Sequence, residues 1–107
     1  MGLENSQVID AIGTEAETGI VVLSIIDGWD WTDEAEHLMA LQDKINAYLG
    51  FVESGQIGEV YPDAVGHALK IDIISMFPLP DTADSFIEEA AKVSSQLKID
   101  LNQRMAP

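Results

Sequence analysis

Two short stretches near the start of the chain carry the hydrophobic pattern of strands. In residues 8–12 (VIDAI), Val8, Asp10 and Ile12 alternate with Ile9 and Ala11. Residues 20–26 form an almost continuous apolar run rich in β-branched side chains. Because the polar residues 13–19 between them begin and end with glycine, the pattern predicts a β-hairpin. Apolar positions on both faces of the second run indicate a strand inside the sheet, covered on at least one side.

The clearest periodic pattern predicts a helix over residues 33–53. Apolar residues recur there at spacings of three and four, which places them on one stripe of a helix. The stripe consists of Leu38, Leu41, Ile45, Tyr48 and Val52. Thr32 is the expected N-cap, because its hydroxyl can accept a hydrogen bond from a free backbone N–H. Gly55 is expected to end the helix in the left-handed conformation.

The next two segments predict a loop and a strand. Residues 55–67 contain three glycines and one proline, which favours a loop with a short edge strand at residues 57–61. Residues 68–77 alternate in the manner of a strand. Pro78 and Pro80 are expected to end this strand, because a proline cannot donate to the ladder of hydrogen bonds.

The last part of the chain predicts a second helix and a short strand. Residues 81–97 have an apolar stripe at helical spacing, and Asp81 or Thr82 is the expected N-cap. Ile99 and Leu101 alternate with polar residues, which indicates a short last strand before a tail at residues 103–107.

This order of elements, β-β-α-β-α-β, predicts an α+β fold. We expect a two-layer α/β sandwich in which a mixed sheet of about four strands carries two helices on one face. The length of 107 residues is typical of one domain, so residues 1–107 are expected to form a single domain.

Composition narrows the function classes. The chain has 19 acidic and 5 basic residues, a net charge of −14, and no cysteine. Without cysteine there is no disulfide, thiolate metal site or cysteine nucleophile. A strongly acidic surface repels nucleic acids and anionic membranes, so neither is an expected partner. No secretory signal or long apolar run stands out, and we expect a cytoplasmic location.

The acidic residues are unevenly distributed. Residues 1–63 contain 13 carboxylates and one base, whereas residues 64–107 contain 6 carboxylates and four bases. A carboxylate-rich half can attract a basic protein partner over a long distance and so raise its association rate. Solubility alone is the other explanation for such a charge.

The candidate functional residues gather where the second strand ends and the first helix begins. Residues 27–37 (DGWDWTDEAEH) hold five carboxylates, two tryptophans and a histidine. The later strand-to-helix junction, residues 77–84, is expected at the same edge, because the loops after parallel strands meet there. The predicted partner-binding residues are Asp27, Trp29, Asp30, Trp31, Asp33, Glu34, His37, Asp81 and Asp84.

The chemistry of these residues favours a cation or a basic partner. Carboxylates near two helix N-termini would repel a phosphate, which a helix N-terminus otherwise attracts. The same carboxylates are also explained without any ligand, as helix caps and as a solvated acidic face. The tryptophans are either interface anchors or residues that close the core. His37 is expected within reach of Asp33. No nucleophile motif, EF-hand or paired-histidine spacing accompanies it, so we expect no catalytic residue, metal ligand or cofactor.

Several segments resemble a family of small bacterial proteins known only as a domain of unknown function. The segments, with x for any residue, are 8–13 (VIDAIG), 17–19 (ETG), 22–25 (VLSI), 27–31 (DxxDW), 36–49 (EHLxxLQxKINxYL), 53–55 (ESG) and 61–64 (YPDA). The resemblance covers most of residues 7–80. It implies a bacterial origin and an uncharacterised role, and brings no activity, cofactor or site residue.

The leading expectation is a non-enzymatic interaction protein that binds a basic protein partner, in an immunity-type or regulatory role. The alternative is a domain that binds a small ligand or a divalent metal at residues 27–37 and 77–84. A third hypothesis is a homo-oligomer that buries the apolar side chains of Ile74 and Met76 between subunits.

Overall fold

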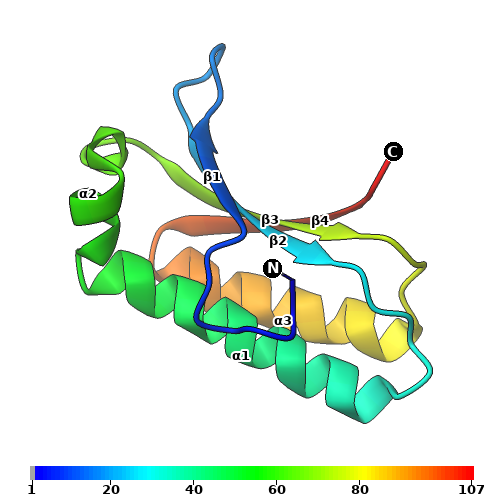
Figure 1. Ribbon diagram of the computed structural model, residues 1–107. Helices are drawn as coiled ribbons and strands as arrows, with labels where there is room; N and C mark the ends of the chain where they lie inside the picture. The colour runs from blue at the N-terminus through cyan, green and yellow to red at the C-terminus, as the bar shows by residue number, and fades with distance from the viewer. Residues whose placement is uncertain (1) are drawn as a thin grey trace.

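The computed structural model describes residues 2–107 and shows one four-stranded mixed sheet with helices on one face (Figure 1). The elements are β1 (Ala11–Thr14), β2 (Val21–Asp27), α1 (Glu34–Glu53), α2 (Gln56–Val60), a 3₁₀ turn (Pro62–Ala64), β3 (Leu69–Ser75), α3 (Asp81–Gln96) and β4 (Ile99–Met105). The strand order is β1-β2-β3-β4, with β1 antiparallel to β2 and the other pairs parallel. The predicted α+β class is confirmed, with α2 as an additional short helix.

The core lies between the sheet and the two long helices. Along β2 the buried residues Val21, Leu23 and Ile25 alternate with partly exposed residues. Because successive side chains of a strand point to opposite faces, this alternation turns one face of β2 toward α1 and α3. Leu41 and Ile45 of α1 are buried in the same cluster. The hydrophobic stripe that predicted the first helix is therefore its core-facing side.

The first strand begins later than predicted, at residue 11 rather than residue 8. Residues 2–10, which we call the N-terminal segment, instead run across α1 (Figure 1). Lys44 Nζ donates to the carbonyls of Asn5 and Val8 at 2.8 and 2.6 Å. The backbone N–H of Asp10 donates to the hydroxyl of Tyr48 at 2.8 Å. These contacts with α1 occupy backbone groups that a longer strand would have used.

Both predicted N-caps are wrong. Asp33 caps α1, because its carboxylate accepts a hydrogen bond from Glu36 N at 3.1 Å. Thr32 precedes this cap, and its own N–H donates to Asp30. At α3 the N-cap is Pro80, which makes no side-chain cap hydrogen bond. Gly55, by contrast, ends α1 in the left-handed conformation, with φ of 81°, as predicted.

Two predicted boundaries in the second half of the chain are also wrong. Residues 57–60 belong to helix α2, and Tyr61 is its C-cap, so no edge strand forms there. Ile57 is buried against the core, and the chain reverses at Gly55. The last strand extends to Met105, through residues predicted as a tail, because its ladder with β3 continues to that residue. None of the described helices is long and apolar enough to cross a membrane.

Candidate functional site

A buried pair of Asp27 and His37 lies at the centre of the candidate site. Asp27 is the last residue of β2, and His37 lies in the first turn of α1. Asp27 Oδ2 is 2.6 Å from His37 Nε2, and each residue is only 1% exposed. The pair joins the end of a sheet strand to the start of the helix that covers it.

Both nitrogens of the His37 imidazole have partners. Nδ1 is 2.9 Å from the carbonyl oxygen of Asp30, and Nε2 faces the Asp27 carboxylate. A carbonyl and an ionised carboxylate can only accept, so with Asp27 ionised the ring donates from both nitrogens. In this arrangement neither nitrogen is open to a substrate or a metal ion. The prediction that His37 pairs with the side chain of Asp33 is wrong. The Asp33 carboxylate caps the helix, and His37 contacts Asp33 only through the helical hydrogen bond from its backbone N–H to the Asp33 carbonyl.

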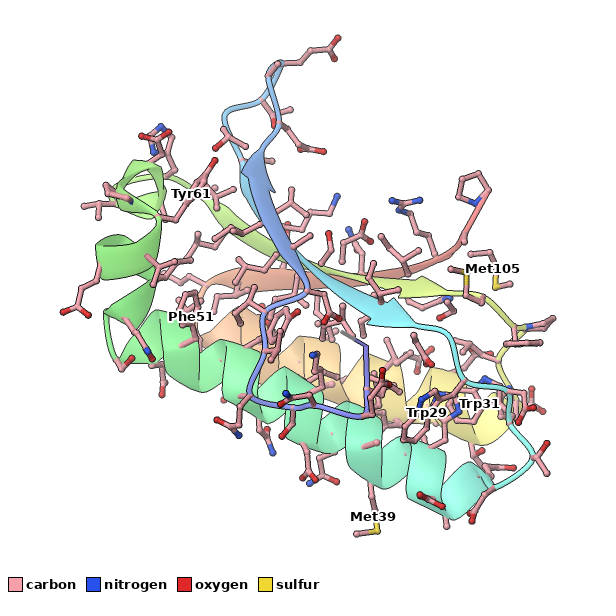
Figure 2. The ribbon with its side chains drawn as sticks, viewed as in Figure 1. Trp29, Trp31, Met39, Phe51, Tyr61 and Met105 are labelled. Atoms are coloured by element: carbon pink, nitrogen blue, oxygen red, sulfur yellow. The ribbon has the colours of Figure 1, made fainter. Side chains whose placement is uncertain are left out.

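Two tryptophans enclose this imidazole. The Trp31 ring stacks on His37 with 3.5 Å between the ring centroids and an interplanar angle of 11°. The Trp29 ring meets the same imidazole edge-on, at 5.6 Å and 63°. Both indoles lie close together where α1 begins (Figure 2). Trp29 Nε1 also donates to Glu4 Oε2 at 3.3 Å, so the N-terminal segment is tied to the site.

A shallow acidic hollow opens beside the buried pair. Its volume is about 430 Å³, and it is lined by Gly28, Trp29, Asp30, Thr32, Asp33 and Glu36. Three of these six residues are carboxylates and none is basic. A second hollow of about 410 Å³ shares Gly28 and Trp29 with it and adds Glu4 from the N-terminal segment. We call the first of the two the acidic hollow.

The carboxylate of Asp30 is held in its charged form. The backbone N–H of Thr32 donates to Asp30 Oδ1 at 3.0 Å and lowers the pKa of this carboxyl below its usual value. The Thr32 hydroxyl and the charge of His37 lower the pKa further, although less. Since hydrogen bonds to the charged form favour that form, the acidic hollow keeps a negative charge at this position even in mild acid.

The two strand-to-helix junctions meet at one edge of the sheet, as the sequence predicts. The hydroxyl of Thr82, in the first turn of α3, donates to Glu34 Oε1 in the first turn of α1. Asp81 is exposed at the start of α3. Asp84 lines a different hollow, of about 260 Å³, with Pro78, Leu79, Gln103 and Met105. The later junction therefore supports the edge but contributes no lining residue to the acidic hollow.

The predicted partner-binding residues differ in how far a partner can reach their side chains. Asp30 and Asp33 are exposed in the acidic hollow, and Trp29 is half-buried in its wall. Asp27 and His37 are enclosed, so their side chains position the loop and are out of reach of a partner. The sequence reasoning missed Glu36 and Glu4. The three-residue spacing of Glu36 from Asp33 could have indicated it, whereas nothing in the sequence places Glu4 beside Trp29.

A second buried charge pair supports the site from the side of the N-terminal segment. Lys44 Nζ is 3.0 Å from Asp10 Oδ1, and both side chains are 0% exposed. The other carboxylate oxygen of Asp10 accepts a hydrogen bond from Ile26 N. Tyr48 donates to the carbonyl of Ser24 at 2.6 Å. Lys44 is the single base among residues 1–63, so its burial leaves the described part of this half without an exposed lysine or arginine.

The described residues, 2–107, contain no group of three or more histidine, aspartate or glutamate side chains that could hold a metal ion.

No curated protein and no solved structure matches the chain. A family model does match, and it covers residues 1–107 from end to end. The chain therefore belongs to DUF6572, a family of unknown function.

Proposed function

We propose that this protein is a non-enzymatic binding protein whose acidic hollow receives a basic side chain of a protein partner. The concrete form is an immunity-type or regulatory role, in which the chain covers a basic surface of the partner. One observation carries the proposal: Asp30, Asp33 and Glu36 line a hollow beside the Trp29 indole, with no basic residue in its wall.

The chemistry of the acidic hollow suits a guanidinium group. A guanidinium is planar, stacks on an aromatic face and donates in a fork that matches a carboxylate. Trp29 supplies the aromatic surface and Asp30 supplies a carboxylate with a lowered pKa. A lysine ammonium can use the same groups as a point charge, with less geometric selectivity.

The loop that bears these groups is held in place before any partner arrives. Trp29 N donates to Asp27, Thr32 N donates to Asp30, and the ring of His37 is bonded to the Asp30 carbonyl. A preorganised loop loses little conformational entropy on binding, so more of the contact energy is available for affinity. This supports a role for the Asp27–His37 pair in positioning the hollow.

The charge of the surrounding half supports the same partner. Residues 1–63 carry 13 carboxylates, and their only lysine or arginine, Lys44, is buried. A field of one sign attracts a basic protein before contact and raises its association rate, with a strong dependence on salt.

The test compares two variants of equal charge. In the hollow variant, Asp30→Asn, Asp33→Asn and Glu36→Gln neutralise the acidic hollow, and asparagine at residue 33 retains the helix cap. In the control variant, Asp43→Asn, Glu53→Gln and Asp63→Asn neutralise three exposed carboxylates outside the hollow. Affinity capture from native lysate with mass spectrometry identifies the partner, and titration calorimetry compares its affinity for the two variants.

We expect a basic partner whose affinity falls at least about tenfold for the hollow variant and much less for the control. Equal losses of affinity in the two variants would show that net charge alone is responsible.

Titration of the wild type with Mg²⁺, Ca²⁺, Mn²⁺ and Zn²⁺, followed by amide NMR, tests the alternative function. Saturable shifts confined to residues 27–37 and 77–84 would favour a metal-binding domain over the proposed one.

A further inference from the structure

We infer that the free edge of β4 is a self-complementary interface through which two copies of this chain pair, joining their sheets into one. This inference concerns the opposite edge of the sheet from β1 and does not depend on the proposed function. It also places the contact on a strand edge, and not on the apolar side chains of Ile74 and Met76.

β4 is an edge strand with unused backbone groups. It lies last in the sheet order and pairs only with β3, over all seven of its residues and without a bulge. Ala106 N donates to Ser75 O at 2.8 Å, so the even-numbered residues direct their backbone groups toward β3. Since these directions alternate along a strand, residues 99, 101, 103 and 105 direct their N–H and C=O groups toward the free edge.

The strand also lacks the usual protection against edge pairing. Natural edge strands are shortened, bulged, or carry proline or charged side chains, above all lysine, because an open row of N–H and C=O groups is a template for another strand. β4 has seven residues, IDLNQRM, with no proline and no lysine, and its two charged residues, Asp100 and Arg104, have opposite signs. The other edge strand, β1, has only four residues. The two edges of the sheet therefore differ in their capacity to pair.

An antiparallel pairing about a twofold axis at Asn102 fits the side chains. On the face of the sheet that carries no helices, Asp100 then lies opposite Arg104 of the second copy. By symmetry, Arg104 lies opposite Asp100 of the second copy. On the helical face, Ile99 lies opposite Met105, which is 45% exposed in the single chain. Opposite charges and apolar pairs across antiparallel strands stabilise a sheet. The Asp100–Arg104 contacts also fall at non-hydrogen-bonded pairs, where side chains are closest.

The neighbouring registers fit less well. The helices of both copies lie on one face of the joined sheet only if residues that face the same side lie opposite each other, which requires the twofold axis to pass through a residue. The neighbouring registers therefore have their axes at residues 101 and 103. The first sets Lys98 against Arg104, and the second sets Asp100 against Ala106, outside the strand. Arg104 remains available in the favoured register, because its contact with Asp72 at 2.9 Å uses Nε and leaves both Nη groups to donate.

The test measures association of the full chain by sedimentation equilibrium over a range of concentrations, at about 0.15 M salt to screen the charge of the two copies. We expect a reversible dimer. Asp100→Lys makes the net charge less negative, so general repulsion predicts tighter association, whereas our register predicts about tenfold weaker association because both charge pairs become repulsive. Asp43→Lys, an exposed site on α1, makes the same charge change away from the edge.

A backbone variant provides a second test. Gln103→Pro removes an N–H that faces the free edge and leaves the ladder with β3 intact, and Gln103→Ala is its control because it changes the side chain and keeps the N–H. We expect loss of the dimer only with proline, and amide spectra confirm that each variant is folded. A monomeric wild type, or a dimer that tolerates both Asp100→Lys and Gln103→Pro, would overturn the inference.

Discussion

The carboxylate of Asp27 lies 2.6 Å from Nε2 of His37, and the protein surrounds both residues almost completely. The pair connects the end of β2 to the first turn of α1 and carries the loop that forms the acidic hollow. Asp27 also accepts from Trp29 N, and His37 contacts the carbonyl of Asp30. The shape of the hollow therefore depends on a contact that no partner can touch.

Replacing His37 with leucine should destabilise the fold strongly. The variant leaves the Asp27 carboxylate buried without its partner, which typically costs about 3–5 kcal/mol of unfolding free energy. Urea unfolding measures the loss. His67→Leu is the matched control, since His67 is exposed, and we expect a change there within about 0.5 kcal/mol. Similar losses for both histidines would contradict a special role for the buried pair.

Lys44→Met should be costly for the same physical reason. The methionine retains the length of the side chain but removes the ammonium that pairs with the buried carboxylate of Asp10 and donates to the carbonyls of Asn5 and Val8. We expect a loss of about 3–5 kcal/mol in urea unfolding. Lys92→Met removes an exposed lysine paired with Glu89, whose side chains are 70% and 73% exposed, and its effect should stay below about 1 kcal/mol.

Tyr48 should make the protein sensitive to alkaline pH. Burial raises the pKa of its phenol well above the usual value, and the nearby Asp10 carboxylate adds to the effect. Because the folded state then holds the proton more tightly than the unfolded state, this contribution to stability is complete below about pH 10 and declines as the pH rises further.

The absorbance of the phenolate measures this directly. In a Tyr61→Phe variant, Tyr48 is the only remaining tyrosine, and its ionisation should begin well above the usual pH. Unfolding measurements should show that Tyr48→Phe is less stable than the wild type near neutral pH, because its hydrogen bonds to Ser24 and Asp10 are lost. An ordinary tyrosine titration in the folded state would contradict this prediction.

Asp30 should respond to pH in the opposite direction. Its carboxyl pKa is lowered, chiefly by the backbone N–H of Thr32. The stabilising contribution is therefore present above the ordinary pKa of an unfolded aspartate and is lost as the pH falls through the lower folded value. Carboxyl NMR should give a midpoint below that of a free aspartate. Thr32→Val, which removes the hydroxyl but keeps the N–H, should raise the midpoint only in part.

Local periodicity explains how much of the fold could be predicted. The apolar, β-branched run in residues 20–26 and the helical spacing in residues 33–53 both reflect burial in the core, so these elements could be predicted without knowledge of their partners. The end of β4 could not, because Arg104 belongs to the sheet through its contact with Asp72, far away in the chain. Residues 57–61 misled the prediction, because a buried Ile57 suits a helix as well as a strand.

The candidate site was predicted in its location more than in its contacts. Residues 27–37 stand out through their carboxylates and tryptophans, and Asp30, Asp33 and Trp29 do line one hollow. The partner of His37 was misassigned, because helical spacing offered Asp33 while the true partner, Asp27, depends on how α1 packs on the sheet. The burial of Lys44 beneath the N-terminal segment is likewise a tertiary effect that charge counting cannot detect.

The parallel pairing of β2 with β3 has a consequence for the rate of folding. The hairpin of β1 and β2 can close early, because its strands are neighbours in the chain. Pairing Val21 with Leu69 must instead close a loop that contains all of α1 and α2. Such non-local contacts slow folding, since chain entropy is lost before the contacts repay it. Helix formation should therefore precede assembly of the sheet. The β3–β4 pair closes a shorter loop, which contains only α3, so it should form before the β2–β3 pair.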